Sequence, residues 1–161
     1  MLSKALKVDA AKIKLALKEL PRKKTLLVVL AVFCVALPFA FYRPSGVRLR
    51  VGSSSYTLAL ATTEQTRNIG LGGRNTMALD QGMLFVFDKP AVQCFWMKDM
   101  HFPLDIIWLD AAKGVSYIKQ NVSPDTYPAT FCSPTATKYV IELNAGEVAK
   151  QHMSIGQKLS L

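Results

Sequence analysis

Residues 82–87 read Gly-Met-Leu-Phe-Val-Phe (GMLFVF), an unbroken apolar run of the length of one strand. A short apolar run that contains β-branched and aromatic side chains is typical of a strand that is covered on both faces. Asp88, Lys89 and Pro90 follow it and predict a turn. We therefore expect this segment to be a central strand of a sheet, with the other elements arranged around it.

Short strands and two short helices are predicted on both sides of this run. Alternating and apolar patterns between turn residues predict further strands at residues 47–51, 56–61, 92–97, 104–110, 114–122, 138–143 and 157–161. One helix is predicted to begin at Thr62, where Thr62 and Gln65 fit a capping box, and a second to cover residues 145–153. The fold class is thus predicted as mostly β (β-rich α+β), a compact antiparallel sheet or small barrel with two short helices.

Two segments have the composition of loops. Residues 71–81 begin within a glycine-rich turn, and residues 123–137 contain three prolines. Loops of this length usually carry a function or move. The turn itself, residues 70–74, could present backbone N–H groups to an anion, although a glycine-rich turn alone is a weak signal.

Residues 25–42 form an apolar run without a charge, and Arg22, Lys23 and Lys24 stand directly before it. Eighteen residues of helix at about 1.5 Å per residue are about 27 Å long, enough to cross a bilayer core. A basic cluster keeps its side of the span in the cytoplasm. A cleaved signal peptide fits less well, because a cut after Ala40 would place Pro38 in the cleavage motif.

The sequence therefore predicts a single-pass protein of the cytoplasmic (inner) membrane, with its N-terminus in the cytoplasm. Residues 1–24 would be a basic cytoplasmic tail, residues 25–42 a transmembrane helix and residues 43–46 a linker. Residues 47–161 would form one extracytoplasmic β-rich domain, long enough for one core and too short for two.

The basic residues gather in the tail. Residues 1–24 hold eight basic and two acidic side chains, so most of the net charge of +9 lies there. Leucines at helical spacing favour an amphipathic helix on the inner membrane surface, with a disordered basic tail as the alternative. Aromatic stacking residues are absent from the tail, so nucleic acid is not an expected partner. The expected partners are membrane lipid, through residues 1–42, and an envelope polymer or envelope protein.

The numbers of cysteine and histidine residues limit the disulfides and metal sites that the chain can form. Cys34 lies in the apolar run, whereas Cys94 and Cys132 lie in the outer domain. A disulfide between these two and a pair of free thiols both remain open, because the sequence does not give the distance between them. With only two histidines in the chain, a metal site of several imidazoles is excluded. No metal and no cofactor is therefore predicted.

Four motifs of the outer domain occur in a familiar order. They are GMLFVF (82–87), FWMK (95–98), PLDIIWLD (103–110) and YVIELNAG (139–146). Over residues 47–161 the chain resembles the bacterial and archaeal family known as domain of unknown function 192. The resemblance implies a small β-rich domain, often exported or membrane-anchored, without an established activity. The chain departs from the family pattern at Gly72, where Met is usual, and at Asp99-Met100, where Asn-Thr is common.

Six residues that match the family pattern are the candidates for ligand binding: Arg74, Trp96, Lys98, Asp105, Glu142 and Asn144. Asp105 and Glu142 lie among apolar residues, where an unpaired charge costs several kcal/mol. Arg74 and Lys98 are their candidate partners. These four could form a structural ion-pair network, or a pocket that binds a polar ligand or performs acid–base chemistry. Both tryptophans, Trp96 and Trp108, are expected in the core.

Three classes of function remain open. The first is a membrane-anchored extracytoplasmic binding or assembly module of unknown ligand. The second is an envelope-directed enzyme that uses the carboxylates of Asp105 and Glu142. The third is a structural accessory subunit of a membrane complex. No Gly-x-Ser-x-Gly motif is present, and the small set of catalytic residue types favours the first and third classes over the second.

Overall fold

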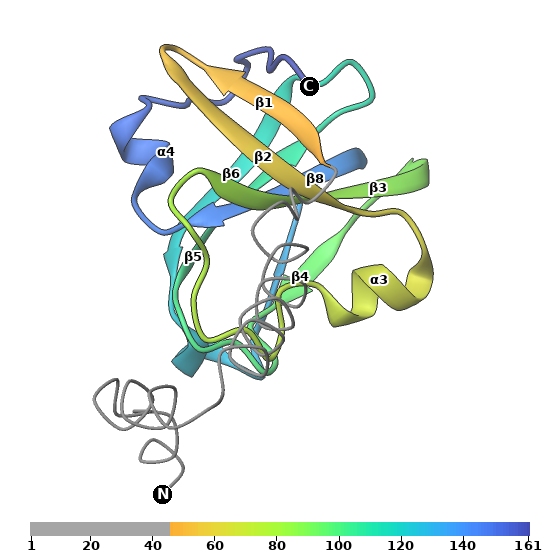
Figure 1. Cartoon of the computed structure of the whole chain (residues 1–161). Helices are drawn as coiled ribbons and strands as arrows, with labels where there is room; N and C mark the ends of the chain where they lie inside the picture. Colours follow the sequence, from red (N-terminus) through yellow and green to blue (C-terminus); the bar gives the residue numbers. More distant parts are fainter. Residues whose placement is uncertain (1–45) are drawn as a thin grey trace, which may run out of the picture. The chain divides into compact units, whose positions relative to one another are not determined.

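The computed structural model describes residues 46–161. These residues form a six-stranded sheet, a two-stranded ribbon and short helices (Figure 1). The strands are β1 (Val47–Val51), β2 (Ser54–Ala61), β3 (Gln81–Ala91), β4 (Cys94–Trp96), β5 (Leu104–Leu109), β6 (Val115–Val122), β7 (Thr130–Cys132) and β8 (Thr137–Asn144). The helices are α3 (Glu64–Ile69), the 3₁₀ turn η1 (Pro124–Thr126) and α4 (Glu147–Lys150).

A membrane span is not found among the helices of residues 46–161, since none of them is sufficiently long and apolar. The predicted span at residues 25–42 and the predicted basic tail at residues 1–24 lie outside the described residues. Both stay predictions.

The main sheet has the strand order β1-β2-β3-β8-β5-β6, with β4 and β7 forming the separate ribbon. Every neighbouring pair is antiparallel except β2 and β3, which run parallel. The mostly β class with two short α-helices is thus confirmed, whereas the expected antiparallel sheet or small barrel is corrected to a mixed sheet with one parallel pair. A parallel pair needs a long crossover connection. Residues 62–80, which contain α3, supply it.

The sheet has a core cluster on each of its faces. The alternation of β5 divides its side chains, so that Ile107 and Leu109 join one cluster while Ile106 and Trp108 join the other. All six residues of β5 are buried, and β3 contributes Leu84 to the first cluster and Phe85 to the second. The apolar run at residues 82–87 is therefore a central strand covered on both faces, as its pattern predicts.

Several predicted boundaries shift. The predicted turn at residues 88–90 is part of β3, which continues to Ala91 across a register irregularity. Helix α3 is capped by Thr63 rather than Thr62, because the Thr66 hydroxyl performs the role expected of Gln65. The predicted strand at residues 157–161 consists of two isolated bridges, one of Ser160 to Arg50 and one of Lys158 to Gly114.

Candidate ligand-binding pocket

A pocket of about 240 Å³ opens on the sheet face that carries Phe85. Three parts of the chain surround it: α3 with the glycine turn that follows, the strand β3, and the segment of β4 that ends at Lys98. The strand β8 contributes Glu142. The parallel crossover brings α3 to this face, since it leaves β2 and returns to β3 (Figure 1).

Glu142 is the only buried acidic or basic residue in the lining of this pocket, with 5% of its surface exposed. On β8 it lies opposite Met83 of β3 and Ile106 of β5. Among the described residues, no ion pair or hydrogen bond reaches its carboxyl group. Burial alone raises the pKa of Glu142 to about 8. The pocket therefore contains a carboxylic acid that is largely neutral at pH 7.

Aromatic rings form the wall next to this acid. The rings of Phe85 and Phe95 meet edge to face, with centroids 4.8 Å apart. Phe95 also meets Trp108 edge to face, with centroids 5.9 Å apart. Phe95 thereby joins the small ribbon to the main sheet. These contacts give the pocket a rigid apolar wall.

Two basic side chains complete the lining, and they are held in different ways. The guanidinium of Arg67 donates to the carbonyl oxygens of Thr62 at 2.7 Å and Val86 at 2.9 Å, and it lies over the ring of Phe87. The exposed Lys98 has its ammonium 5.9 Å from the centroid of the Trp96 ring. Within residues 46–161 it forms no ion pair. Arg67 thus has a structural role, whereas the charge of Lys98 remains available to a ligand.

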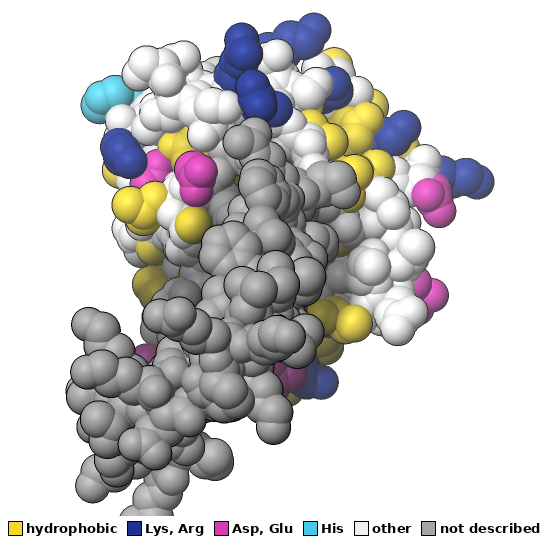
Figure 2. Space-filling view, in the orientation of Figure 1, with side chains coloured by type: hydrophobic (Ala, Val, Ile, Leu, Met, Phe, Trp, Pro, Cys, Tyr) yellow, Lys and Arg dark blue, Asp and Glu magenta, His cyan; other side chains and the backbone are white. Residues whose placement is uncertain are grey.

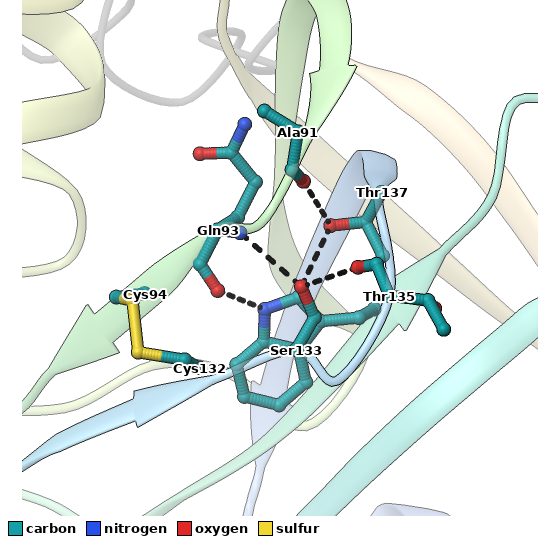
Figure 3. The surroundings of a disulfide bond; sticks show 8 residues. Ala91, Gln93, Cys94, Cys132, Ser133, Thr135 and Thr137 are labelled. Carbon is teal, nitrogen blue, oxygen red and sulfur yellow. Dashed lines mark hydrogen bonds between the residues drawn. A yellow bond between two sulfur atoms is a disulfide. The ribbon is translucent and has the colours of Figure 1, made fainter.

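The ribbon that carries Phe95 and Trp96 is fastened by a disulfide between Cys94 and Cys132, which face each other in the β4–β7 register (Figure 3). Beside the disulfide, the buried hydroxyl of Ser133 accepts from the backbone N–H of Gln93 at 3.2 Å. The carbonyl of Gln93 accepts from the indole N–H of Trp108 at 3.0 Å. The disulfide thus closes the ribbon on itself, and the hydrogen bond from Trp108 of β5 attaches the ribbon to the main sheet.

Asp105 lies on the opposite face of the sheet from Glu142, because it pairs with Leu143 rather than with Glu142. Its two carboxylate oxygens accept from the backbone N–H groups of Asn121 and Val148, each at 2.8 Å. The structure does not bring the two carboxylates into one pocket.

The expected ion pairs of Asp105 and Glu142 with Arg74 and Lys98 are also absent from the described residues. The ion pair found there joins Lys150 to Glu147 at 3.0 Å. Arg74 is exposed in the turn after α3, away from the lining. Asn144 donates to the carbonyl of Ala78 at 3.0 Å and so fixes the 71–81 loop. Of the six candidates, the structure places Glu142, Lys98 and Trp96 at the pocket.

Trp96 is 51% exposed, so its expected place in the core was wrong. In β4 the side chains alternate, and Phe95 takes the inward position. The outward Trp96 ring meets Tyr127 edge to face, with centroids 6.3 Å apart. A two-stranded ribbon has one covered face, so one of two adjacent aromatic residues must face solvent. Trp108 is fully buried, as predicted.

Most residues of the pocket wall were not among the candidates from the sequence. Phe95 adjoins Trp96 in the FWMK motif, and this position could have indicated it as a wall residue.

The lining also includes Gly72, in the glycine turn that could present N–H groups to an anion. A Cβ atom at Gly72 would lie 3.0 Å from the carbonyl oxygen of Ile69 and 3.4 Å from that of Lys98. A side chain at Gly72 would therefore crowd these two carbonyl groups, and the close packing of the turn favours glycine there. Nothing in the sequence marked Arg67.

These features define a small mixed β domain with an aromatic-walled pocket and a buried acid in the lining of that pocket. The chain belongs to the family DUF192, "Uncharacterized ACR", whose model matches residues 47–161. No curated protein matches the chain.

Two solved structures are similar to the chain. One, from Sinorhizobium meliloti 1021, is named "a putative transcription regulator"; it is 34% identical, with a TM-score of 0.65 over 70% of this chain and 89% of that one. The other is a protein of unknown function from Novosphingobium aromaticivorans, 28% identical, with a TM-score of 0.67 over 71% of this chain and 84% of that one.

Proposed function

We propose that residues 47–161 form a binding module that holds a small polar ligand in the pocket at Glu142. In this proposal, residues 25–42 anchor the module so that it faces away from the cytoplasm. The observation that carries the proposal is the carboxyl group of Glu142, a 5% exposed residue of the pocket lining with no ion-pair partner among the described residues, whose oxygens reach the pocket rather than being sealed in the core. A carboxyl group that loses most of its hydration without gaining an ion-pair partner costs stability in its charged form. Such a cost is typical of sites that are kept for a function.

The size of the pocket limits the ligand. Its volume of about 240 Å³ lies below the range of roughly 300–1,000 Å³ that is usual for drug-sized ligands. The rigid wall of Phe85 and Phe95 does not need to form when the ligand binds. We therefore expect a ligand of the size of a small metabolite, in a largely preformed site.

Binding is favoured over catalysis by two carboxylates. Asp105 is engaged by two backbone N–H groups on the other face of the sheet, so it has no access to a ligand beside Glu142. Catalysis by a carboxylate pair requires both groups at the same substrate. The remaining acid, Glu142, has only the exposed Lys98 as a free charged neighbour in the lining.

Nucleic acid is not part of this proposal, although one similar structure is named as a transcription regulator. Among the described residues the longest helix is α3, with six residues, which is short for a groove-reading helix. On the face drawn in Figure 2, Lys and Arg side chains lie at several separate places, with hydrophobic and acidic side chains between them.

The proposal is tested by screening a fragment library with ligand-observed NMR against the full-length chain in nonionic detergent. We expect a set of fragments that bind the wild type and lose binding in Glu142→Gln. Glu147→Gln is the matched control, because Glu147 is equally buried, with 5% exposure, but lies outside the pocket lining. Fragments that bind all three proteins equally, or a library without a single pocket ligand, would contradict the proposal.

A further inference from the structure

We propose that the ligand is a small zwitterion of the amino acid type, whose ammonium group lies against Glu142 and whose carboxylate faces Lys98. This inference rests on the proposed function and names the ligand class of the same pocket.

The pocket lining offers a hydrogen-bond acceptor in the carboxyl group of Glu142. Glu142 has a carboxyl group without a donor among the described residues. Beside it, Gly72 packs closely against the backbone of Ile69 and Lys98, since a Cβ atom there would lie 3.0 Å and 3.4 Å from their carbonyl oxygens. A group with several donors and a positive charge satisfies such a site, and a primary ammonium has three donors.

The wall of the pocket also suits a cation. Aromatic faces carry negative electrostatic potential, and ammonium groups are attracted to them. The chain already uses this contact twice at the pocket, with Arg67 over Phe87 and with Lys98 over Trp96. Phe85 and Phe95 have no such cation among the contacts within residues 46–161.

The charge of the lining argues against a simple cation as the ligand. Two basic groups, Arg67 of α3 and Lys98 after β4, line the same pocket as Glu142, whereas β3 contributes the uncharged Phe85 and Phe87. A purely cationic ligand is repelled by these groups. The guanidinium of Arg67 is engaged by two backbone carbonyls, so Lys98 remains to receive an anionic group. A ligand with a positive end and a negative end satisfies both sides.

Binding of an ammonium group changes the protonation of Glu142. Burial holds the pKa of the free acid at about 8, so most molecules are protonated at pH 6 to 7. An ammonium group favours the carboxylate, so a proton leaves Glu142 for the buffer when the ligand binds. The affinity should therefore increase about tenfold per pH unit below the pKa. A neutral ligand that accepts a hydrogen bond from the protonated acid should bind with nearly constant affinity below this pKa and weaken above it.

The test is isothermal titration calorimetry on the full-length chain in nonionic detergent at pH 6, 7 and 8. The probes are glycine, 3-aminopropanoate and 4-aminobutanoate, with butylammonium, butanoate and butanamide as single-ended or neutral counterparts. We expect one of the three amino acids to bind at least about tenfold more tightly than butanoate and butanamide, with proton release and tighter binding at higher pH. Glu142→Gln should abolish this binding.

Lys98→Gln is the second variant, because Lys98 is exposed and its replacement spares the fold. We expect it to weaken the amino acids until they bind no better than butylammonium. Preferred binding of butanamide that depends on Glu142 would overturn the ligand class and leave the binding module in place. Absence of binding by all amine probes, or unchanged affinity in Glu142→Gln, would also overturn it. The fragment screen decides separately whether the pocket binds any ligand.

Discussion

Glu142 stands in the middle of the sheet without a partner among the described residues, and its neighbours on the adjacent strands are apolar. This arrangement raises the free energy of the carboxylate form relative to the protonated form. The group loses hydration when the chain folds, and the protein offers no donor in exchange. Glu147 shows the contrasting case. Burial raises its pKa, but hydrogen bonds from Tyr56 and Lys150 outweigh this effect, and the pKa is lowered.

We predict that the stability of the domain decreases as the pH rises from about 4.5 to about 8. In this window the folded chain holds a proton on Glu142 that the unfolded chain has lost, because the pKa is raised from 4.5 to about 8. The contribution to the free energy of unfolding should fall by about 1.4 kcal/mol per pH unit and become constant above the folded pKa. Urea unfolding of the full-length chain at each pH measures it.

Glu142→Gln should remove this pH dependence of the free energy of unfolding, since an amide does not titrate. The variant should also be more stable than the wild type at pH 8. Glu147→Gln should retain it, because the lowered pKa of Glu147 acts only at acidic pH. If the free energy of unfolding changes with pH in the same way in the wild type and in Glu142→Gln across this window, Glu142 is not the cause of the pH dependence.

The sequence identified the candidate acids correctly as buried polar groups but assigned them the wrong surroundings. Asp105 and Glu142 are each surrounded by apolar residues, so the chain itself shows that both face a core. Which face each one takes depends on the β5–β8 register, where Asp105 lies opposite Leu143. A shift of one residue would have placed both on one face. Register follows from packing between distant segments, which a single sequence does not reveal.

At the level of elements, Asp105 connects the strand β5 to the helix α4. The N-cap of α4 is Gly146, which has no side chain to cap the helix. The carboxylate of Asp105 accepts from the N–H of Val148 in the first turn and so takes over this role. Its second oxygen accepts from Asn121 in β6. One side chain thereby joins three elements.

We predict that Asp105→Asn destabilises the domain by about 1–3 kcal/mol, the usual cost of an unsatisfied buried polar group. The amide of Asn has one acceptor oxygen, so its NH₂ group would face one of the two backbone N–H donors. Thermal unfolding of the full-length chain measures the change. Asp88→Asn, at an exposed position of β3, is the control and should be neutral. A melting temperature equal to that of the wild type would contradict this role of Asp105.

The elements themselves were predictable to different degrees. The strand at residues 47–51 was predicted with its observed bounds, because alternation and turn residues are local signals. The parallel pairing of β2 with β3 was not, since antiparallel neighbours are the usual result of short connections and residues 62–80 cross over instead. The ribbon of β4 and β7 fell within segments predicted as a strand and a loop, and its disulfide depended on a distance that the sequence does not contain.

At the level of the whole molecule, we predict that the described domain lies outside the cytoplasm. Ser53, in the exposed turn between β1 and β2, is a suitable position for a label. In a Cys34→Ala background, a membrane-impermeant maleimide should modify Ser53→Cys in intact cells but not Ser3→Cys, because the basic cluster before residue 25 keeps its side in the cytoplasm.

In permeabilised cells both variants should react, which controls for the reactivity of the two thiols. Modification of Ser3→Cys alone in intact cells would reverse the proposed topology.

The place of β8 in the sheet also decides when the domain can fold. This strand lies between β3 and β5, yet it is the last strand to be synthesised. Until it leaves the ribosome, β1 to β3 and β5 to β6 are two separate groups with no shared hydrogen bonds in the main sheet. Contacts between segments distant in sequence also form slowly. A nascent chain of this protein therefore remains open to chaperones and proteases until β8 has left the ribosome.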